Sequence, residues 1–241
     1  MRTGNPALNA EVFTNVHRTS GSHMTLEGAV NKSFILLALL VATSVFTWNV
    51  GYPYSAFLLI GGIIGGLVVA IITIFKKEWS PVTAPLYALF EGVVIGGISS
   101  LMELAFPGIV FQAVLLTMGT FFCLLMAYKS GYIKATENFR LGLFAATGAV
   151  MLIYLASFVL GFFGINIPYI HESGLIGIGF SLVVVVIAAL NLVLDFDFIE
   201  QGAKNKLPSY MEWYAAFGLL VTLVWLYLEI LRLLAKIRSR D

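Results

Sequence analysis

Residues 174–199 read GLIGIGFSLVVVVIAALNLVLDFDFI. The first ionisable side chain in this stretch is Asp195, so a long and uninterrupted apolar run precedes that position. A helix needs about 20 mostly apolar residues to cross the hydrocarbon layer of a bilayer. The stretch is long enough and apolar enough to do so, and it predicts a membrane-spanning helix.

Runs of the same kind recur along the whole chain. The predicted spans are residues 33–50, 55–75, 82–104, 108–128, 140–163, 174–199 and 210–234. Prolines near the short connections suit helix ends. They are Pro53, Pro81, Pro107, Pro168 and Pro208. The sequence therefore predicts an all-α, polytopic membrane protein, a bundle of seven transmembrane helices in which consecutive helices pack antiparallel.

The composition supports a membrane protein over a soluble domain. Of 241 residues, 59% are hydrophobic and only 11% are charged, whereas soluble domains carry about 25% charged residues. The net charge of +1 gives no field that would favour nucleic acid or an acidic partner. The single cysteine, Cys123, excludes an internal disulfide and a cysteine-based metal site.

The N-terminal part of the chain is polar. Residues 1–31 form a predicted cytoplasmic or interfacial arm, and residues 32–241 form the transmembrane domain. A cleaved signal peptide is not expected, because the first apolar run begins only at Ser33 and no small-residue cleavage site follows it.

Basic residues predict the orientation, because Lys and Arg stay on the cytoplasmic side. With the N-terminus inside, the inner segments hold Arg2, Arg18, Lys32, Lys76, Lys77, Lys129, Lys134, Arg140, Lys204 and Lys206, and the three outer loops hold none. Seven spans place the basic tail outside, with Arg232, Lys236, Arg238 and Arg240. A last segment that folds back would remove this conflict. Seven crossings are preferred, because residues 210–228 are long enough to span.

Small residues indicate where helices approach closely. The second predicted span contains two glycine pairs and the third repeats glycine at a four-residue spacing. These positions are Gly61, Gly62, Gly65, Gly66, Gly92 and Gly96. Tight packing within one bundle is the preferred interpretation over a dimer contact.

Ionisable side chains inside spans are costly and usually face a bundle interior or a water path. Counting about 1.5 Å per residue from the predicted cytoplasmic ends, Glu91 lies roughly 14 Å deep and Asp195 roughly 6 to 10 Å deep. Glu229 and Glu103 lie about 28 and 31 Å from the inner surface on the same count. Two acidic levels follow, one in the inner half and one at the outer mouth.

The inner level suggests a proton-sensitive latch. If their helices are neighbours, Glu91 and Asp195 meet and share a proton. Asn191, one turn before Asp195, shares its face, whereas Asp197 stands about 200° around the helix and is expected to be solvated at the inner edge. Glu103 and Glu229 either line a pore mouth or simply reach headgroup water.

Four segments carry a resemblance to a known family. They are residues 24–28 (MTLEG), 78–85 (EWSPVTAP), 87–92 (YALFEG) and 194–199 (LDFDFI). In this order and with this number of spans, the sequence resembles the Bax inhibitor-1 family of membrane proteins, in its bacterial YccA-like branch. The resemblance covers nearly the whole chain after the arm.

The resemblance implies a seven-helix fold with a central last helix in the bacterial inner membrane. It also implies a pH-sensitive calcium leak controlled by two aspartates on the sixth and seventh helices. Asp195, four residues before Ile199, matches the first aspartate. The second corresponds to Glu229 if residues 226–229 are matched, or to Thr222 if the ending 231–234 is matched. Depth favours Thr222, so we hypothesise that Glu91 supplies the second carboxylate.

Three classes of function are compared on this basis. The first is a leak for calcium or other cations, which are transported and not tightly bound. The alternative is a non-conducting interaction or quality-control protein that binds other membrane proteins or a membrane protease. An enzyme is not expected, because the sequence contains no His-Glu-x-x-His, Gly-x-Ser-x-Gly or Gly-x-Gly-Asp motif. No cofactor or resident metal is predicted.

Overall fold

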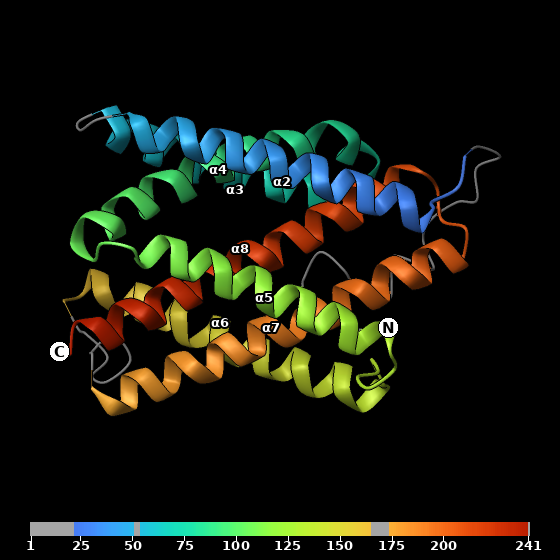
Figure 1. Ribbon diagram of the computed structural model, residues 1–241. Helices are drawn as coiled ribbons and strands as arrows, with labels where there is room; N and C mark the ends of the chain where they lie inside the picture. The colour runs from blue at the N-terminus through green and yellow to red at the C-terminus, as the bar shows by residue number, and fades with distance from the viewer. Residues whose placement is uncertain (1–21, 51–53, 165–173, 241) are drawn as a thin grey trace. The chain divides into compact units, whose positions relative to one another are not determined.

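Long helices make up most of the protein (Figure 1). The computed structural model describes residues 22–50, 54–164 and 174–240. The helices in these ranges are α2 (Leu26–Asn49), α3 (Tyr54–Phe75), α4 (Ser80–Ala105), α5 (Ile109–Lys129), α6 (Glu137–Phe162), α7 (Leu175–Lys204) and α8 (Tyr210–Arg238), with a short 3-10 helix η1 (Lys77–Trp79) before α4. All seven α-helices are long and apolar enough to cross a membrane. The predicted all-α, multi-pass class is confirmed.

The helix ends differ from the predicted spans. Helix α2 begins at Leu26, because the Thr25 side chain caps it by accepting a hydrogen bond from the Gly28 N–H at 2.9 Å. Helix α4 begins at Ser80 and includes Pro81, whereas the sequence predicts Pro81 in the connection before the span. A proline fits there because the first turn of a helix needs no backbone N–H. Pro53 and Pro168 lie outside the described residues.

Contacts along the chain divide it into two compact units. Of the described residues, the N-terminal unit contains those within 22–105 and 195–221, and therefore α2, α3, α4, the end of α7 and the start of α8. The C-terminal unit contains those within 106–194 and 222–240, and therefore α5, α6, the start of α7 and the end of α8. The division into an arm (1–31) and a transmembrane domain (32–241) stays a prediction.

In the N-terminal unit, α4 packs on α2 through glycine. A Cβ atom at Gly92 would overlap the Thr43 hydroxyl and the Leu40 carbonyl of α2, and one at Gly96 would overlap the Ser44 backbone. The Ser44 hydroxyl also donates to the Gly92 carbonyl at 3.0 Å. These two helices therefore approach at backbone distance, as the sequence predicts.

The packing of α3 on α4 follows the same rule. Cβ atoms at Gly62 and Gly65 of α3 would lie 2.9 and 2.7 Å from side-chain atoms of Val94 and Phe90 on α4. Gly61, by contrast, has open space around it. The prediction that glycine marks close packing within one chain is confirmed at Gly62, Gly65, Gly92 and Gly96, whereas Gly61 and Gly66 leave room for a Cβ atom.

Helix α8 is the most buried of the described spans. In its most apolar window 67% of the residues are buried, against 44% in α7 and 17% in α2, α3, α5 and α6. The low values leave broad apolar faces on those four helices, as expected for helices in contact with lipid. A well-buried last helix agrees with the central position implied by the resemblance.

Candidate functional site

Asp195 and Asp197 are both buried near the end of α7, in the N-terminal unit. The exposed fraction is 0% for Asp195 and 8% for Asp197. The expectation that Asp197 is solvated at the inner edge is therefore wrong. The physical reason for the burial of Asp197 is that α7 continues to Lys204, so Asp197 lies within a packed part of the helix and not at its end.

Glu91 lies on α4 in the same unit and is half-buried. The Tyr87 hydroxyl, one turn earlier, hydrogen-bonds the Glu91 carboxylate. Gly66 of α3 leaves room beside this carboxylate, since a Cβ atom there would lie 3.6 Å from Glu91 Oε2. The structure thus places Glu91 in a confined polar position, and its pairing with Asp195 stays a prediction.

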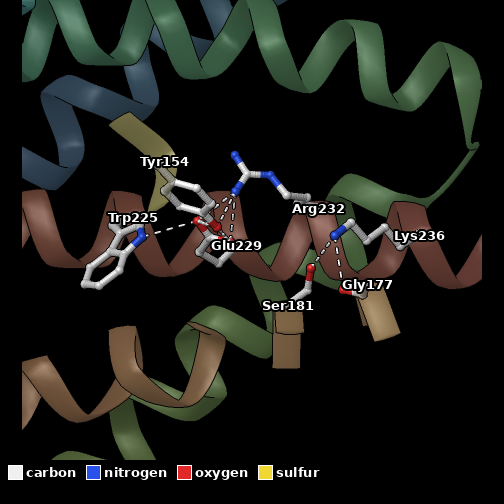
Figure 2. A network of polar contacts seen from close by, with 7 residues as sticks. All are labelled: Tyr154, Gly177, Ser181, Trp225, Glu229, Arg232 and Lys236. Atoms are coloured by element: carbon white, nitrogen blue, oxygen red, sulfur yellow. Dashed lines mark hydrogen bonds and ion pairs between the residues drawn. The ribbon is translucent and has the colours of Figure 1, made fainter. Parts of the chain in front are cut away.

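Glu229 is the centre of a polar contact in the C-terminal unit (Figure 2). Its carboxylate is 1% exposed and forms an ion pair with Arg232, whose Nη1 lies 2.9 Å from Oε1. The Tyr154 hydroxyl lies 3.0 Å from each Glu229 oxygen and accepts a hydrogen bond from Arg232 Nη1 at 2.8 Å. Trp225 Nε1 donates to Glu229 Oε1 at 3.3 Å. We call these four residues the Glu229 contact.

The Glu229 contact bears on the predicted outer acidic level, which consists of Glu103 and Glu229. The carboxylate is buried among protein groups and forms an ion pair with Arg232, so it is an interior contact of the C-terminal unit. Glu103 is half-buried near the end of α4 and belongs to the N-terminal unit. A shared outer mouth formed by Glu103 and Glu229 stays a prediction.

The basic end of α8 is held by protein groups. Lys236 lies within α8, 7% exposed, and not beyond the last span as the predicted end at residue 234 implied. Its Nζ atom donates to the Gly177 carbonyl at 3.1 Å and to the Ser181 hydroxyl at 2.8 Å (Figure 2). Arg238 donates to the Pro107 carbonyl and to Gln112. These basic side chains are therefore part of the folded unit.

Asn191 and Thr222 are buried in the C-terminal unit, with exposed fractions of 1% and 2%. The Asn191 Nδ2 atom donates to the Thr147 hydroxyl at 2.9 Å and to the Ile187 carbonyl at 2.8 Å. Thr222 and Asp195 belong to different units. Their correspondence to the paired aspartates stays a prediction.

A contact that sequence reasoning missed joins α2 to the start of α8. The Thr25 backbone N–H and hydroxyl both donate to Glu212 Oε1, at 2.8 and 2.9 Å, and Lys32 Nζ lies 2.5 Å from Oε2. Gly28 is required beside them, because a Cβ atom there would overlap the Glu212 carboxylate. We call Thr25, Lys32 and Glu212 the N-terminal clamp.

Chemically, these groups suit proton exchange and charge pairing. Within the described residues, no group of three or more His, Cys, Asp or Glu side chains is placed to hold a metal ion. The carboxylates of Asp195, Glu91 and Glu229 each stand in a different surrounding.

Comparison with known proteins gives one finding on the whole chain. A family model described as Bax inhibitor 1 like matches residues 5–239. Comparison with curated proteins and with solved structures gave no match.

Proposed function

Because the chain belongs to the Bax inhibitor 1 like family, we propose that this membrane protein is a pH-sensitive cation leak gated by protonation of buried carboxylates. The observation that carries the proposal is Asp195, which is 0% exposed near the end of an apolar membrane-spanning helix. An ionisable side chain in such a position is costly, and it typically marks an ion or proton pathway.

Glu91 is the proposed partner of Asp195 in the gate. Both carboxylates belong to the N-terminal unit, and Glu91 is held by Tyr87 in a confined position. Two nearby carboxylates repel each other when both are ionised and attract when they share one proton. Proton uptake would therefore draw the two helices together, and proton loss would separate them.

We propose that the cation is calcium, which the protein transports without acting as an enzyme. Oxygen ligands suit calcium, which takes six to eight of them in a stable site. A pathway that offers only a few carboxylate oxygens at a time lets the ion pass without tight binding. The proposed setting is the bacterial inner membrane, with the N-terminus in the cytoplasm.

The test measures calcium entry into liposomes that contain the purified protein and a calcium dye, at a series of pH values. We expect the wild type to show pH-dependent entry and Asp195→Asn to flatten that dependence, because an amide cannot take up the proton. Glu27→Gln, at an exposed position of α2, is the matched control and should leave the dependence unchanged.

Other outcomes separate the alternatives. An identical pH response in the wild type, Asp195→Asn and Glu27→Gln would overturn the proposed gate. An absence of calcium entry in all three proteins would overturn the leak, and would favour the alternative that the protein binds other membrane proteins without conducting ions.

A further inference from the structure

Helix α6 carries three polar side chains at intervals of seven residues, namely Arg140, Thr147 and Tyr154. Seven residues are nearly two helical turns, so the three side chains lie on one side of the helix. Arg140 and Thr147 are 6% and 4% exposed. We call these three residues the α6 polar stripe, and its buried members show that it faces the interior of the C-terminal unit.

Two members of the stripe are bonded to other helices of the unit. Thr147 accepts the hydrogen bond of Asn191 from α7, and Tyr154 belongs to the Glu229 contact with α8 (Figure 2). Successive stripe residues are about 10 Å apart along the helix axis. Polar groups are therefore distributed along α6 in the interior of a unit whose outer helix faces are apolar.

The amide oxygen of Asn191 is the observation that points to a ligand. The Asn191 side chain is 1% exposed, and its nitrogen is identified by the carbonyl of Ile187, which can only accept a hydrogen bond. Its Oδ1 atom has no hydrogen-bond donor among the residues that the structure describes. Leaving a buried acceptor without a donor is destabilising, because the group loses its hydrogen bonds to water and gains none in return. Buried acceptors of this kind are usually satisfied by water.

We propose that a hydrated polar route runs along the α6 polar stripe, with a water-binding site at Asn191 and Thr147. The Glu229 contact closes the Tyr154 end of this route, because Arg232 ties the Tyr154 hydroxyl to a carboxylate on α8. The ligand of the site is water. The route belongs to the C-terminal unit, and it does not depend on the proposed leak or on the Asp195 gate.

The test uses cysteine labelling by a hydrophilic, membrane-impermeant methanethiosulfonate, which reacts with the thiolate and therefore needs water around the thiol. Cys123→Ser supplies a cysteine-free chain, since Cys123 is the single cysteine of the sequence. Thr147→Cys is compared in this background with Ala149→Cys. Ala149 is exposed on the opposite side of α6 at nearly the same depth.

We expect the thiol at position 147 to react about ten-fold faster than the thiol at position 149, because only the first is in contact with water. Equal, slow reaction at both positions would show a dry stripe and overturn the proposal. Asn191→Cys, from the facing helix, gives an independent reading if the variant at position 147 does not fold. Labelling requires no ion flux, so its outcome is separate from that of the liposome test.

The closing role of the Glu229 contact has its own test in the Thr147→Cys protein. Arg232→Gln removes the ion pair, and labelling at position 147 should become several-fold faster. Arg238→Gln is the matched control, because it removes a positive charge that contacts Pro107 and Gln112 instead. An unchanged rate in Arg232→Gln, or an equal increase in Arg238→Gln, would overturn the closing role.

Discussion

The two units of this protein hold their helices together by different means. In the N-terminal unit, Gly92 and Gly96 let α4 approach the backbone of α2, and hardly any space is left between them. In the C-terminal unit, α6 is joined to α7 and α8 by polar side chains such as Thr147, Asn191 and Glu229. One interface depends on the absence of side-chain atoms and the other on their presence.

Both kinds of interface suit a membrane protein. Lipid provides no hydrophobic driving force for helix association, so close packing and hydrogen bonds provide it. Glycine contacts gain dispersion energy and carry no charge, and therefore they are insensitive to pH. Polar contacts stabilise by about 0.6–2 kcal/mol each in membranes. The N-terminal packing therefore depends on close backbone approach, and the C-terminal packing depends on hydrogen bonds and charge.

The largest effect is expected when a methyl group is added to the glycine interface. Gly96→Ala places a Cβ atom against the backbone of Ser44, which cannot move aside. Overpacking typically costs about 1–3 kcal/mol, and a clash with backbone atoms is expected at the upper end of that range. We expect most of the Gly96→Ala protein to be lost from the monodisperse peak in size-exclusion chromatography.

Gly61→Ala is the matched control for that variant. Gly61 lies on α3 of the same unit but has open space around it. Alanine favours a helix over glycine by roughly 1 kcal/mol, so this protein should be as stable as the wild type or slightly more stable. Equal losses in both variants would show that glycine acts there by flexibility and not by close packing.

Breaking the Glu229 contact should have the next largest effect. Arg232→Met leaves the Glu229 carboxylate buried with Tyr154 and Trp225 but without its cation. Removing one partner of a buried ion pair costs about 3–5 kcal/mol. We expect a value near the lower limit, because the Arg232 side chain is 44% exposed. The thermal unfolding midpoint in detergent measures the effect.

A double variant sharpens this prediction. In Glu229→Gln/Arg232→Met the uncompensated charge is gone, so a large part of the stability should return. Tyr154 can still donate a hydrogen bond to the amide oxygen at position 229. If the double variant is less stable than Arg232→Met, the carboxylate contributes through its hydrogen bonds and not through the ion pair.

These two interfaces also differ in how far the sequence predicts them. Hydropathy and length are properties of consecutive residues, and they predicted all seven spans in order. Glycine spacing is equally local, and it predicts close packing on α3 and α4 but not which helices are the partners. Glu229 and Arg232 are three residues apart on α8, a spacing that favours ion pairs on a helix, but the sequence analysis does not predict this pair.

Contacts between distant residues were not readable. Tyr154 is 75 residues from Glu229, and Lys32 is 180 residues from Glu212. Nothing in the local pattern of either residue selects its partner, because the choice depends on which helices become neighbours. For the same reason, the pairing of Glu91 with Asp195 remains a prediction, because their positions in the sequence do not show whether the two side chains meet.

A third prediction compares two ion pairs of equal length in different surroundings. Lys32–Glu212 and Lys204–Glu200 are both 2.5 Å long, but Glu212 is 7% exposed and Glu200 is 35% exposed. Glu212→Ala should cost about 2–3 kcal/mol, because it removes charged hydrogen bonds from Thr25 and Lys32. Glu200→Ala should cost roughly 0.5 kcal/mol. Similar thermal shifts would show that burial does not decide the strength of the clamp.

The smallest effects are expected at the two helix caps, one in each unit. Thr136 caps α6 by accepting from the Phe139 N–H at 3.3 Å, and Thr136→Ala should cost about 0.5–1 kcal/mol. Thr25 caps α2 and also donates to Glu212, so Thr25→Ala should cost about 1–2 kcal/mol. In the Glu212→Ala protein, the cost of Thr25→Ala should fall to the value for Thr136→Ala. If the cost of Thr25→Ala does not fall in that background, Thr25 stabilises only the start of α2, and the N-terminal clamp depends on the Lys32–Glu212 ion pair.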